Sequence, residues 1–325
     1  MKENKVYLTR MIPEKAVRYL EEYCSVEVNP DDRPLRREEL IEKVKGMHAV
    51  LTMLNDGVDA TLLDAAGPQC RIFANYAVGY NNIDIPAATK RGVFISNTPD
   101  VLRDATADLA WALMLAAARR ITEGDSLMRS GAFTGWAPLF MLGVEVTGKI
   151  LGIIGAGRIG QAVAQRGTGF GMKILYTANS SKQDFENKTG ARRVGIDELL
   201  SQSDFISIHT PLTPATHHLI GQREFGMMKK TAILVNTARG PVVDEKALAE
   251  ALRTGSIRGA GIDVYEREPE VEKGLLGLSN IVLCPHLGSA TLDTRENMGL
   301  MAAENILAAL RGEIPPQCLN PEAAE

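Results

Sequence analysis

The chain has 325 residues, of which 45% are hydrophobic, 23% charged and 5% aromatic, and this length suffices for two domains that each bury a core. A net charge of −4 gives no reason to expect nucleic acid or an anionic membrane as a partner. The sequence shows no signal peptide, no apolar run of the roughly 18–20 residues that a membrane helix needs, and no metal-ligand spacing among its cysteines, so we expect a cytoplasmic protein with reduced thiols and no metal.

Strand-like and helix-like stretches alternate along the first third of the chain. The predicted strands cover residues 5–8, 49–54, 72–74 and 93–96. Helices lie between them, for example at 13–23 and 36–44. Alternation of this kind is typical of a parallel sheet with helices on both faces.

A long helix rich in Ala and Leu is predicted at about 103–119, after Pro99. Because it is apolar nearly all round, it must be buried on several sides. A seam between domains and a dimer interface are both places that would bury it in this way.

A second alternating series follows. Its predicted strands cover residues 150–154, 173–177, 205–209, 232–236, 259–263 and 281–284, with helices at 161–166, 197–201 and 245–253. This rhythm is typical of a doubly wound dinucleotide-binding domain. The last helix, at about 292–310, comes after the last of these strands, and we expect it to return to the first domain.

The predicted architecture is therefore an α/β protein with two doubly wound domains. A Rossmann-type dinucleotide-binding domain, residues 99–288, is inserted into a discontinuous, flavodoxin-like substrate domain made of residues 1–98 and 289–325.

A glycine motif directly follows the strand 150–154 and opens a helix. It reads Gly155-Ala156-Gly157-Arg158-Ile159-Gly160. The first glycine permits a tight turn, the second lets the backbone approach a pyrophosphate at the helix N-terminus, and the third lets helix and strand pack closely. The motif predicts dinucleotide binding, and the alternative is a glycine-rich turn without a ligand.

The turn after strand 173–177 bears on which dinucleotide binds. It reads Ala178-Asn179-Ser180-Ser181-Lys182. An NAD site places an acid near this point for the ribose 2′-hydroxyl, but the turn has none, and its hydroxyls, amide and Lys182 suit a 2′-phosphate. We therefore expect NADP(H) to be preferred. The turn also lacks an arginine, so an NAD(H) site without a carboxylate is the alternative.

Three polar side chains follow successive predicted strands, Arg239, Glu268 and His286. The carboxyl ends of parallel strands meet at the edge that faces the cofactor. Reduction of a 2-keto acid needs a cation for the carboxylate, an acid that protonates the carbonyl oxygen, and a group that keeps this acid charged. Arginine, histidine and a carboxylate suit these roles in turn.

Three other histidines compete for the role of the acid. His209 ends a predicted strand, whereas His217 and His218 form an adjacent pair that we expect to be solvated. Acidic residues are less plausibly placed for these three than Glu268 is for His286, which is therefore the preferred candidate.

Five segments carry a resemblance to a known family, namely residues 77–84, 155–160, 236–244, 261–269 and 285–291. Together they resemble the D-isomer-specific 2-hydroxyacid dehydrogenase family over essentially the whole chain. Within that family the sequence is most similar to the glyoxylate/hydroxypyruvate reductase (glycerate dehydrogenase) branch, because of residues 170–176, the non-acidic turn after them, and residues 136–138 before Gly143.

The resemblance implies that Arg239 binds the substrate carboxylate and carbonyl, that His286 donates the proton and that Glu268 is its partner. The implied substrate contacts are Leu54 in the pocket lining and the backbone amides of Val78 and Gly79. The implied cofactor contacts are Thr106, the motif from Gly155 to Gly160, Ala178, Asn179, Ser180, Lys182, Pro211, Thr216, Thr237, Ala238, Gly288, and Asp263 on the nicotinamide amide.

One departure from the branch concerns the cofactor. Its NADPH-preferring reductases usually carry an arginine where this sequence has Asn179. The resemblance further implies a homodimer formed through the nucleotide domains, in which Trp136 reaches toward the partner's active site. An ordinary interface anchor is the alternative interpretation of Trp136.

These observations predict an oxidoreductase that reduces glyoxylate or hydroxypyruvate to glycolate or D-glycerate with NAD(P)H. D-3-phosphoglycerate dehydrogenase and D-lactate dehydrogenase are the alternatives within the family, whereas a formate dehydrogenase would carry Gln in place of Glu268. A dinucleotide-sensing co-repressor or scaffold is an alternative of a different class. Turnover of any 2-keto acid would separate the enzymes from the sensor.

Overall fold

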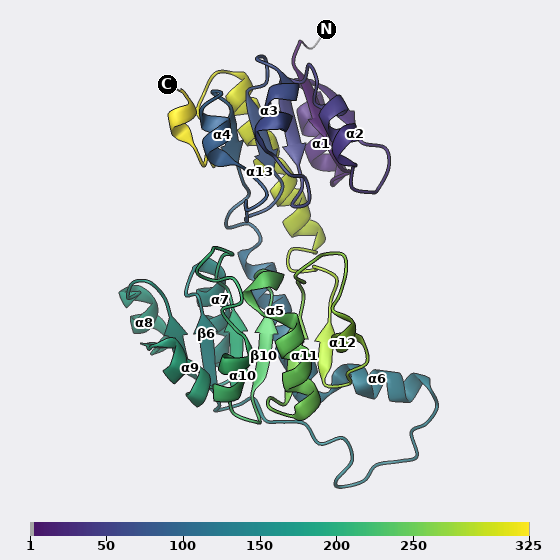
Figure 1. Cartoon of the computed structure of the whole chain (residues 1–325), viewed down its shortest axis with the longest axis vertical. Coiled ribbons are helices and arrows are strands. Elements are labelled where there is room, and N and C mark those ends of the chain that lie inside the picture. The colour runs from purple at the N-terminus through teal and green to yellow at the C-terminus, as the bar shows by residue number, and fades with distance from the viewer. Residues whose placement is uncertain (1–2, 325) are drawn as a thin grey trace. The chain divides into compact units, whose positions relative to one another are not determined.

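The computed structural model describes residues 3–324 and divides the chain into two compact units (Figure 1). Unit 1 combines the residues up to Leu102 with those from Ser289 onward, and unit 2 is the continuous segment Arg103–Gly288. The sequence places the first division after residue 98, whereas the structure places it after Leu102, directly before the long helix begins.

The sheet of unit 1 has five parallel strands in the order β2-β1-β3-β4-β5. They are β1 (Lys5–Leu8), β2 (Ser25–Val28), β3 (Ala49–Thr52), β4 (Ile72–Asn75) and β5 (Phe94–Ser96). This is the doubly wound, flavodoxin-like order. The sequence prediction omitted β2, because this short edge strand alternates exposed and half-buried residues and so lacks the apolar run of a buried strand.

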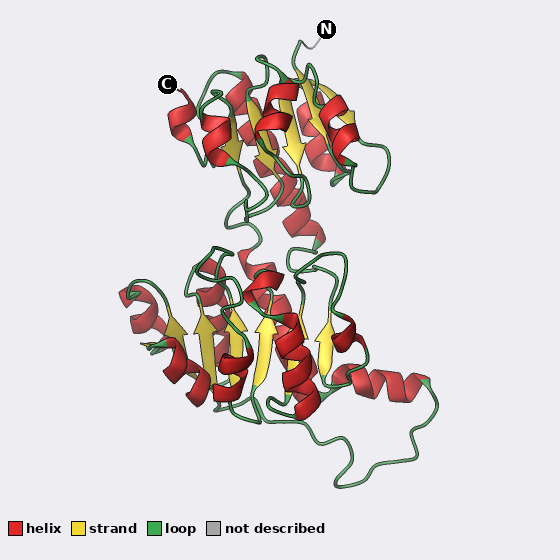
Figure 2. Ribbon diagram, viewed as in Figure 1, coloured by secondary structure: helices red, strands yellow, loops and turns green. Residues whose placement is uncertain are grey.

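Helices cover both faces of this sheet (Figure 2). They are α1 (Glu14–Glu21), α2 (Arg37–Lys43), α3 (Ala60–Ala66), α4 (Ile85–Thr89), α13 (Leu292–Leu310) and a 3₁₀ turn, η2 (Pro321–Ala324). Helices α2, α3 and α4 share one apolar core with Tyr7, Phe73 and Ile95 of the strands. Helix α13 packs on α1 and β4, so the end of the chain completes the unit that its beginning starts.

The sheet of unit 2 has seven parallel strands in the order β12-β11-β10-β9-β6-β7-β8. They are β6 (Ile150–Ile154), β7 (Lys173–Thr177), β8 (Arg192–Arg193), β9 (Phe205–Ile208), β10 (Ile233–Asn236), β11 (Gly259–Ile262) and β12 (Ile281–Leu283). The strand order reverses between β6 and β9, and ligands of such sheets bind outside the strand ends at this point. The sequence prediction omitted only β8 among these strands.

Helices also cover both faces of the second sheet. They are α5 (Arg103–Arg119), α6 (Ile121–Arg129), α7 (Arg158–Gly169), α8 (Gln183–Thr189), α9 (Ile196–Gln202), α10 (Gln222–Met227), α11 (Glu245–Thr254), α12 (Lys273–Leu276) and a 3₁₀ turn, η1 (Gly240–Val242). Successive strand residues enter opposite cores, as Ile153 and Ile154 do, because strand side chains alternate between faces.

The long helix α5 owes its burial to unit 2 itself. It packs along α7 and across β10, β11 and β12. A Cβ atom at Gly261 of β11 would lie only 2.8 Å from Cβ of Leu113, so this glycine permits the close approach of helix and sheet. Trp111 of α5 stacks its indole ring on Phe170, with ring centroids 4.6 Å apart.

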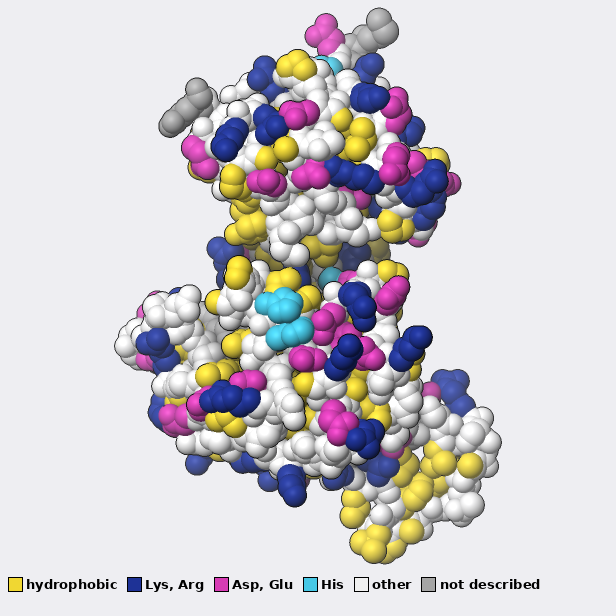
Figure 3. Space-filling view, in the orientation of Figure 1, with side chains coloured by type: hydrophobic (Ala, Val, Ile, Leu, Met, Phe, Trp, Pro, Cys, Tyr) yellow, Lys and Arg dark blue, Asp and Glu magenta, His cyan; other side chains and the backbone are white. Residues whose placement is uncertain are grey.

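Residues 121–142, which we call the arm, project away from the sheet of unit 2 (Figure 1). Figure 3 shows hydrophobic side chains gathered on the arm. Its large exposed apolar residues are Ile121, Met128, Phe133, Trp136, Leu139, Phe140 and Leu142. Trp136 and Leu139 are each 83% exposed, and apolar surface of this extent is typical of an interaction site.

The cysteines do not form disulfide bonds in the described part of the chain. Cys24, Cys70, Cys284 and Cys318 are all free thiols. Within residues 3–324, none of the helices combines the length and the apolar character needed to cross a membrane.

Candidate active site

The glycine motif forms the turn between β6 and α7. Gly155 has a left-handed backbone with φ of 95°, and a Cβ atom there would lie 2.8 Å from the carbonyl carbon of His209. A Cβ atom at Gly160 would lie 2.2 Å from the carbonyl oxygen of Gly155. Both positions therefore require glycine, the first for backbone conformation and the second for the contact between helix and turn.

The same turn leaves room for a ligand. Apart from its chain neighbours, none of the described atoms lies within 4 Å of a Cβ position at Gly157. In the described part of the chain, no side chain caps the N-terminus of α7, so the N–H groups of its first turn suit phosphate oxygens. Among residues 3–324, the hydroxyl of Thr237, after β10, is buried without a hydrogen-bond partner. These features fit a dinucleotide along this edge.

The turn after β7 presents the polar groups that the sequence predicts. The backbone N–H of Lys182 donates to the Tyr176 hydroxyl at 2.9 Å, and its Nζ donates to Ser180 Oγ at 3.2 Å. Ala178 is half-buried, whereas Asn179 and Ser180 are exposed. A cation and a hydroxyl therefore lie together at the place where the ribose 2′ position of a dinucleotide is expected.

His286 and Glu268 lie together after β12 and β11. His286 Nδ1 is 2.8 Å from Glu268 Oε2, and Tyr265 N–H donates to Glu268 Oε1 at 3.1 Å. Burial alone raises the pKa of Glu268. The hydrogen bond and charge of His286 lower it, as do the Tyr265 N–H and the charge of Arg239. Together these effects hold the pKa of Glu268 below its usual value. An ionised Glu268 at Nδ1 leaves Nε2 of His286 to exchange a proton with a substrate.

Arg239 follows β10 and lies in the electric field of the same carboxylate. Burial lowers the pKa of Arg239, while the charge of Glu268 opposes this effect. Asn236 fixes the turn, because it accepts from Ala238 N–H and donates to the Arg239 carbonyl oxygen, both at 3.0 Å. A Cβ atom at Gly240 would lie 1.9 Å from the Tyr265 carbonyl carbon, so the loops that carry Arg239 and Glu268 touch through their backbones.

Asp263 organises the loop that carries His286. Its carboxylate accepts from Leu287 N–H at 2.6 Å and from Gly288 N–H at 2.8 Å, and its carbonyl oxygen accepts from His286 N–H at 2.9 Å. His286 has a left-handed backbone with φ of 57°. Burial raises the pKa of Asp263, and the two backbone bonds and His286 oppose this effect. The structure shows Asp263 holding this loop, whereas its contact with a nicotinamide amide stays a prediction.

Other predicted cofactor residues surround the same strand ends. Gly288 lies beside Asp263 and Thr106 of α5, since its Cβ position is 3.4 Å from atoms of both. In the loop after β9, Thr216 Oγ1 donates to the Pro211 carbonyl oxygen at 2.6 Å. The roles of these residues toward a cofactor stay predictions.

The competing histidines differ in their surroundings. Burial lowers the pKa of His209 to about 3, and its Nε2 lies 2.8 Å from Ser207 Oγ, so a neutral ring makes it a poor proton donor. His218 also has an acidic neighbour, because its Nε2 is 3.2 Å from Glu266 Oε2, a longer distance than the 2.8 Å between His286 and Glu268. The loops after β9 and β11 bring His218 and Glu266 together, and no local sequence signal shows this pairing.

Sequence reasoning also missed a pair of glutamates behind the site. Glu245 N–H donates to Glu266 at 2.9 Å, and Glu266 N–H donates to Glu245 at 2.8 Å. Burial raises the pKa of Glu245. This reciprocal bonding fixes the loop that continues to Glu268 onto the N-terminus of α11.

The predicted substrate residues of unit 1 lie where its parallel strands end. Leu54 follows β3, and Val78 and Gly79 follow β4. The carbonyl oxygen of Ala77 accepts from Thr98 N–H at 2.9 Å, and that of Val78 accepts from Asn97 at 2.8 Å. Because N–H and C=O point in opposite directions across a trans peptide, the N–H groups of Val78 and Gly79 point away from these partners. Substrate binding by these three residues stays a prediction.

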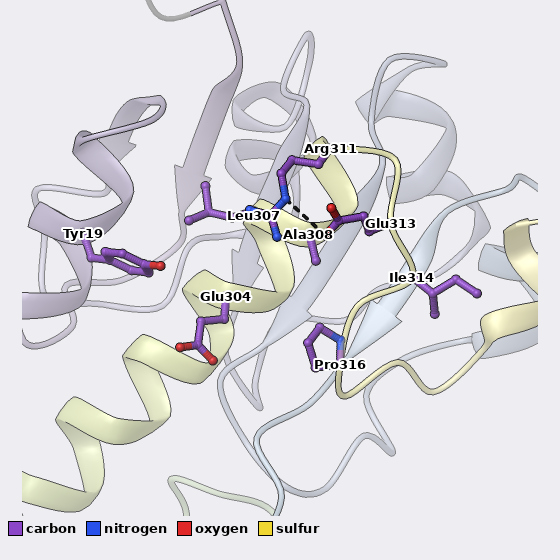
Figure 4. Close-up of a pocket in the computed structure, with 8 residues that line it drawn as sticks. All are labelled: Tyr19, Glu304, Leu307, Ala308, Arg311, Glu313, Ile314 and Pro316. Atoms are coloured by element: carbon purple, nitrogen blue, oxygen red, sulfur yellow. Dashed lines mark hydrogen bonds and ion pairs between the residues drawn. The ribbon is translucent and has the colours of Figure 1, made fainter.

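A separate pocket of unit 1, of about 250 Å³, lies at the end of α13 (Figure 4). It is lined by Tyr19, Glu304, Leu307, Ala308, Arg311, Glu313, Ile314 and Pro316. Arg311 and Glu313 pair with each other at 2.8 Å, and Glu304 adds a second carboxylate to the lining. None of these lining residues belongs to the segments that carry the candidate active site.

Comparison with known proteins gives a consistent result. The family described as D-isomer specific 2-hydroxyacid dehydrogenase, NAD binding domain, matches residues 111–288. The chain is 50% identical over 325 residues to the glyoxylate reductase of Thermococcus kodakarensis. The aligned region covers 99% of this chain and 97% of that protein.

Two solved structures are similar over nearly the full length. The glyoxylate reductase of Paecilomyes thermophila has a TM-score of 0.86 at 35% identity, covering 98% of this chain and 99% of that one. The NADPH-dependent glyoxylate/hydroxypyruvate reductase of Sinorhizobium meliloti, solved with NADP and malonate, has a TM-score of 0.85 at 27% identity and covers 98% of each chain.

Proposed function

Because the chain belongs to the D-isomer-specific 2-hydroxyacid dehydrogenase family, we propose that it reduces glyoxylate to glycolate and hydroxypyruvate to D-glycerate. Membership confirms the resemblance found in the sequence and the α/β fold with a Rossmann-type domain. The protein is a nicotinamide-dependent oxidoreductase. The observation that carries the proposal is the pair of His286 and Glu268, 2.8 Å apart, beside Arg239.

Arg239 holds the substrate in the proposed reaction. Its planar guanidinium group matches a carboxylate and the neighbouring carbonyl oxygen. Burial makes this charge more effective, because a cation removed from water attracts an anion more strongly. The turn fixed by Asn236 and Gly240 holds the backbone of Arg239, and Arg239 Nη1 donates to the Ala238 carbonyl oxygen at 2.7 Å.

His286 supplies the proton. Its Nε2 donates to the carbonyl oxygen while Nδ1 stays bonded to Glu268. The carboxylate stabilises the imidazolium before transfer and orients the neutral ring afterwards. When bound, the reduced nicotinamide supplies the hydride that the carbonyl carbon receives.

An assay of reduced coenzyme at 340 nm tests the activity. We expect rapid oxidation of NADPH with glyoxylate and hydroxypyruvate, and slower oxidation with pyruvate or phosphohydroxypyruvate. Preference for either of the last two would favour D-lactate or D-3-phosphoglycerate dehydrogenase instead. Absence of turnover with all four keto acids would contradict the proposed activity and favour the sensor.

We also propose that NADP(H) is the preferred coenzyme. Support comes from the turn 178–182, which has no acid to bind a 2′-hydroxyl and carries Lys182 beside Ser180. The Sinorhizobium meliloti relative is described as NADPH-dependent. Assays with NADPH and NADH in parallel test this preference, and activity confined to NADH would contradict it.

The arm supports a further proposal, that the chain forms a homodimer in which the arm is buried. Replacing both Trp136 and Leu139 by serine removes the two most exposed apolar side chains of the arm. We expect this variant to shift toward the monomer in sedimentation equilibrium, because interface stability rests on buried apolar area.

The matched control for the arm is Tyr23→Ser, which changes an aromatic residue that is 55% exposed on unit 1. It should sediment as the unmodified chain does. A monomeric unmodified chain would contradict the proposed dimer.

A further inference from the structure

A second cation lies beside the turn 178–182. Arg193 belongs to β8, which pairs in parallel with β7 so that Arg193 is opposite Tyr176. Its Nε donates to the Ala178 carbonyl oxygen at 3.0 Å, and its Nη2 donates to the Asn179 carbonyl oxygen at 3.3 Å. An edge strand therefore places a guanidinium group directly against the backbone of a turn that contains no arginine of its own.

The charges around the turn favour an anion. Lys182 and Arg193 contribute two positive charges, and Lys182 Nζ bonds to the Ser180 hydroxyl. The nearby Glu186 carboxylate contributes one negative charge, so the turn keeps a net positive charge, and Oε1 of Glu186 accepts hydrogen bonds from Tyr176 and Ser181. Those bonds, with a smaller contribution from the charge of Arg193, lower the pKa of Glu186.

We propose that Arg193 binds the 2′-phosphate of NADPH together with Lys182 and Ser180, an inference that rests on the coenzyme preference proposed above. A guanidinium group has five N–H donors, and those that contact the turn fix its plane. The donors on its exposed side are then oriented for phosphate oxygens, which guanidinium binds in a bidentate manner. The neighbouring strand thus supplies the arginine that a 2′-phosphate site needs.

Arg192 provides a matched control. It precedes Arg193 on the same strand, and consecutive strand residues point to opposite faces. Its guanidinium group pairs with Glu198 of α9 at 2.7 Å. Both arginines are exposed, so replacing either one perturbs the sheet edge to a similar extent, but only Arg193 contacts the turn.

Equilibrium binding to the full chain, followed by coenzyme fluorescence, tests the proposal. Arg193→Gln keeps N–H donors for the two carbonyl oxygens but removes the charge. It should weaken NADPH binding by about 10- to 100-fold, the usual effect of losing hydrogen bonds to a charged group, and leave NADH binding nearly unchanged. Arg192→Gln should leave both affinities unchanged, and Arg193→Lys should restore part of the NADPH affinity.

Competition with adenine nucleotides gives an independent readout. Arg193→Gln should weaken the binding of 2′,5′-ADP, which carries the 2′-phosphate, but not that of ADP. Equal losses for NADPH and NADH would make Arg193 only a clamp for the turn and would overturn the inference, as would unchanged NADPH binding. An unmodified chain that binds NADH at least as tightly as NADPH would overturn the proposed preference, and this inference with it.

Discussion

Replacing His286 by alanine will lower kcat for glyoxylate reduction by about 10²–10⁴-fold, the range typical of a general acid. The reason is that the Glu268 carboxylate holds Nδ1 at 2.8 Å, which leaves Nε2 to protonate the substrate carbonyl oxygen in the proposed reaction. Without it, the developing negative charge must take its proton from water. Steady-state kinetics with saturating coenzyme measures the effect, and the KM for NADPH should change little, because hydride donor and proton donor bind separately.

His217→Ala is the matched control for this change. His217 is an exposed histidine whose ring contacts that of His218 in a tilted arrangement, with ring centroids 4.1 Å apart. It should retain the activity of the unmodified chain. Near-normal turnover in the His286 variant, with an intact fold by circular dichroism, would refute the assignment of the acid.

Replacing Arg239 by alanine will lower kcat/KM for the keto acid by about 10²–10³-fold, because a pair of charge-assisted hydrogen bonds to the carboxylate is lost. Arg239→Lys will recover only part of this loss, since an ammonium group keeps the charge but cannot reproduce the planar fork. The measurement is kcat/KM for glyoxylate, together with the Kd for NADPH, which should remain within the same order of magnitude.

Arg267→Ala is the corresponding control, because Arg267 is exposed on the loop after β11. It should leave kcat/KM unchanged. A loss confined to NADPH affinity in the Arg239 variant would place this arginine in the coenzyme site instead of the substrate site.

The site could be predicted from the sequence where it depends on strand ends. Arg239, Glu268 and His286 each follow a buried strand, and parallel topology brings such positions to one edge. The glycine motif could also be predicted, because its spacing reflects backbone contacts that only glycine permits, as at Gly160.

The rest depends on contacts between distant loops. Arg193 lies on a strand of two residues, too short for any periodic pattern, and its proximity to Ala178 follows from strand pairing alone. The contact between His218 and Glu266 joins two loops that are far apart along the chain. Single-sequence patterns record local preference, and such pairings are set by the tertiary fold.

The left-handed backbone of His286 has an energetic consequence for the whole chain. A residue other than glycine in this conformation costs about 1 kcal/mol or more, although histidine tolerates it better than branched residues do. The hydrogen bonds to Asp263 hold the strained turn in place. At this position the requirements of folding and of the proposed proton transfer are therefore opposed: glycine would relax the native state, whereas the proposed chemistry needs the imidazole. Part of the chain's margin of stability is thus given up to keep a titratable ring at the edge of the sheet.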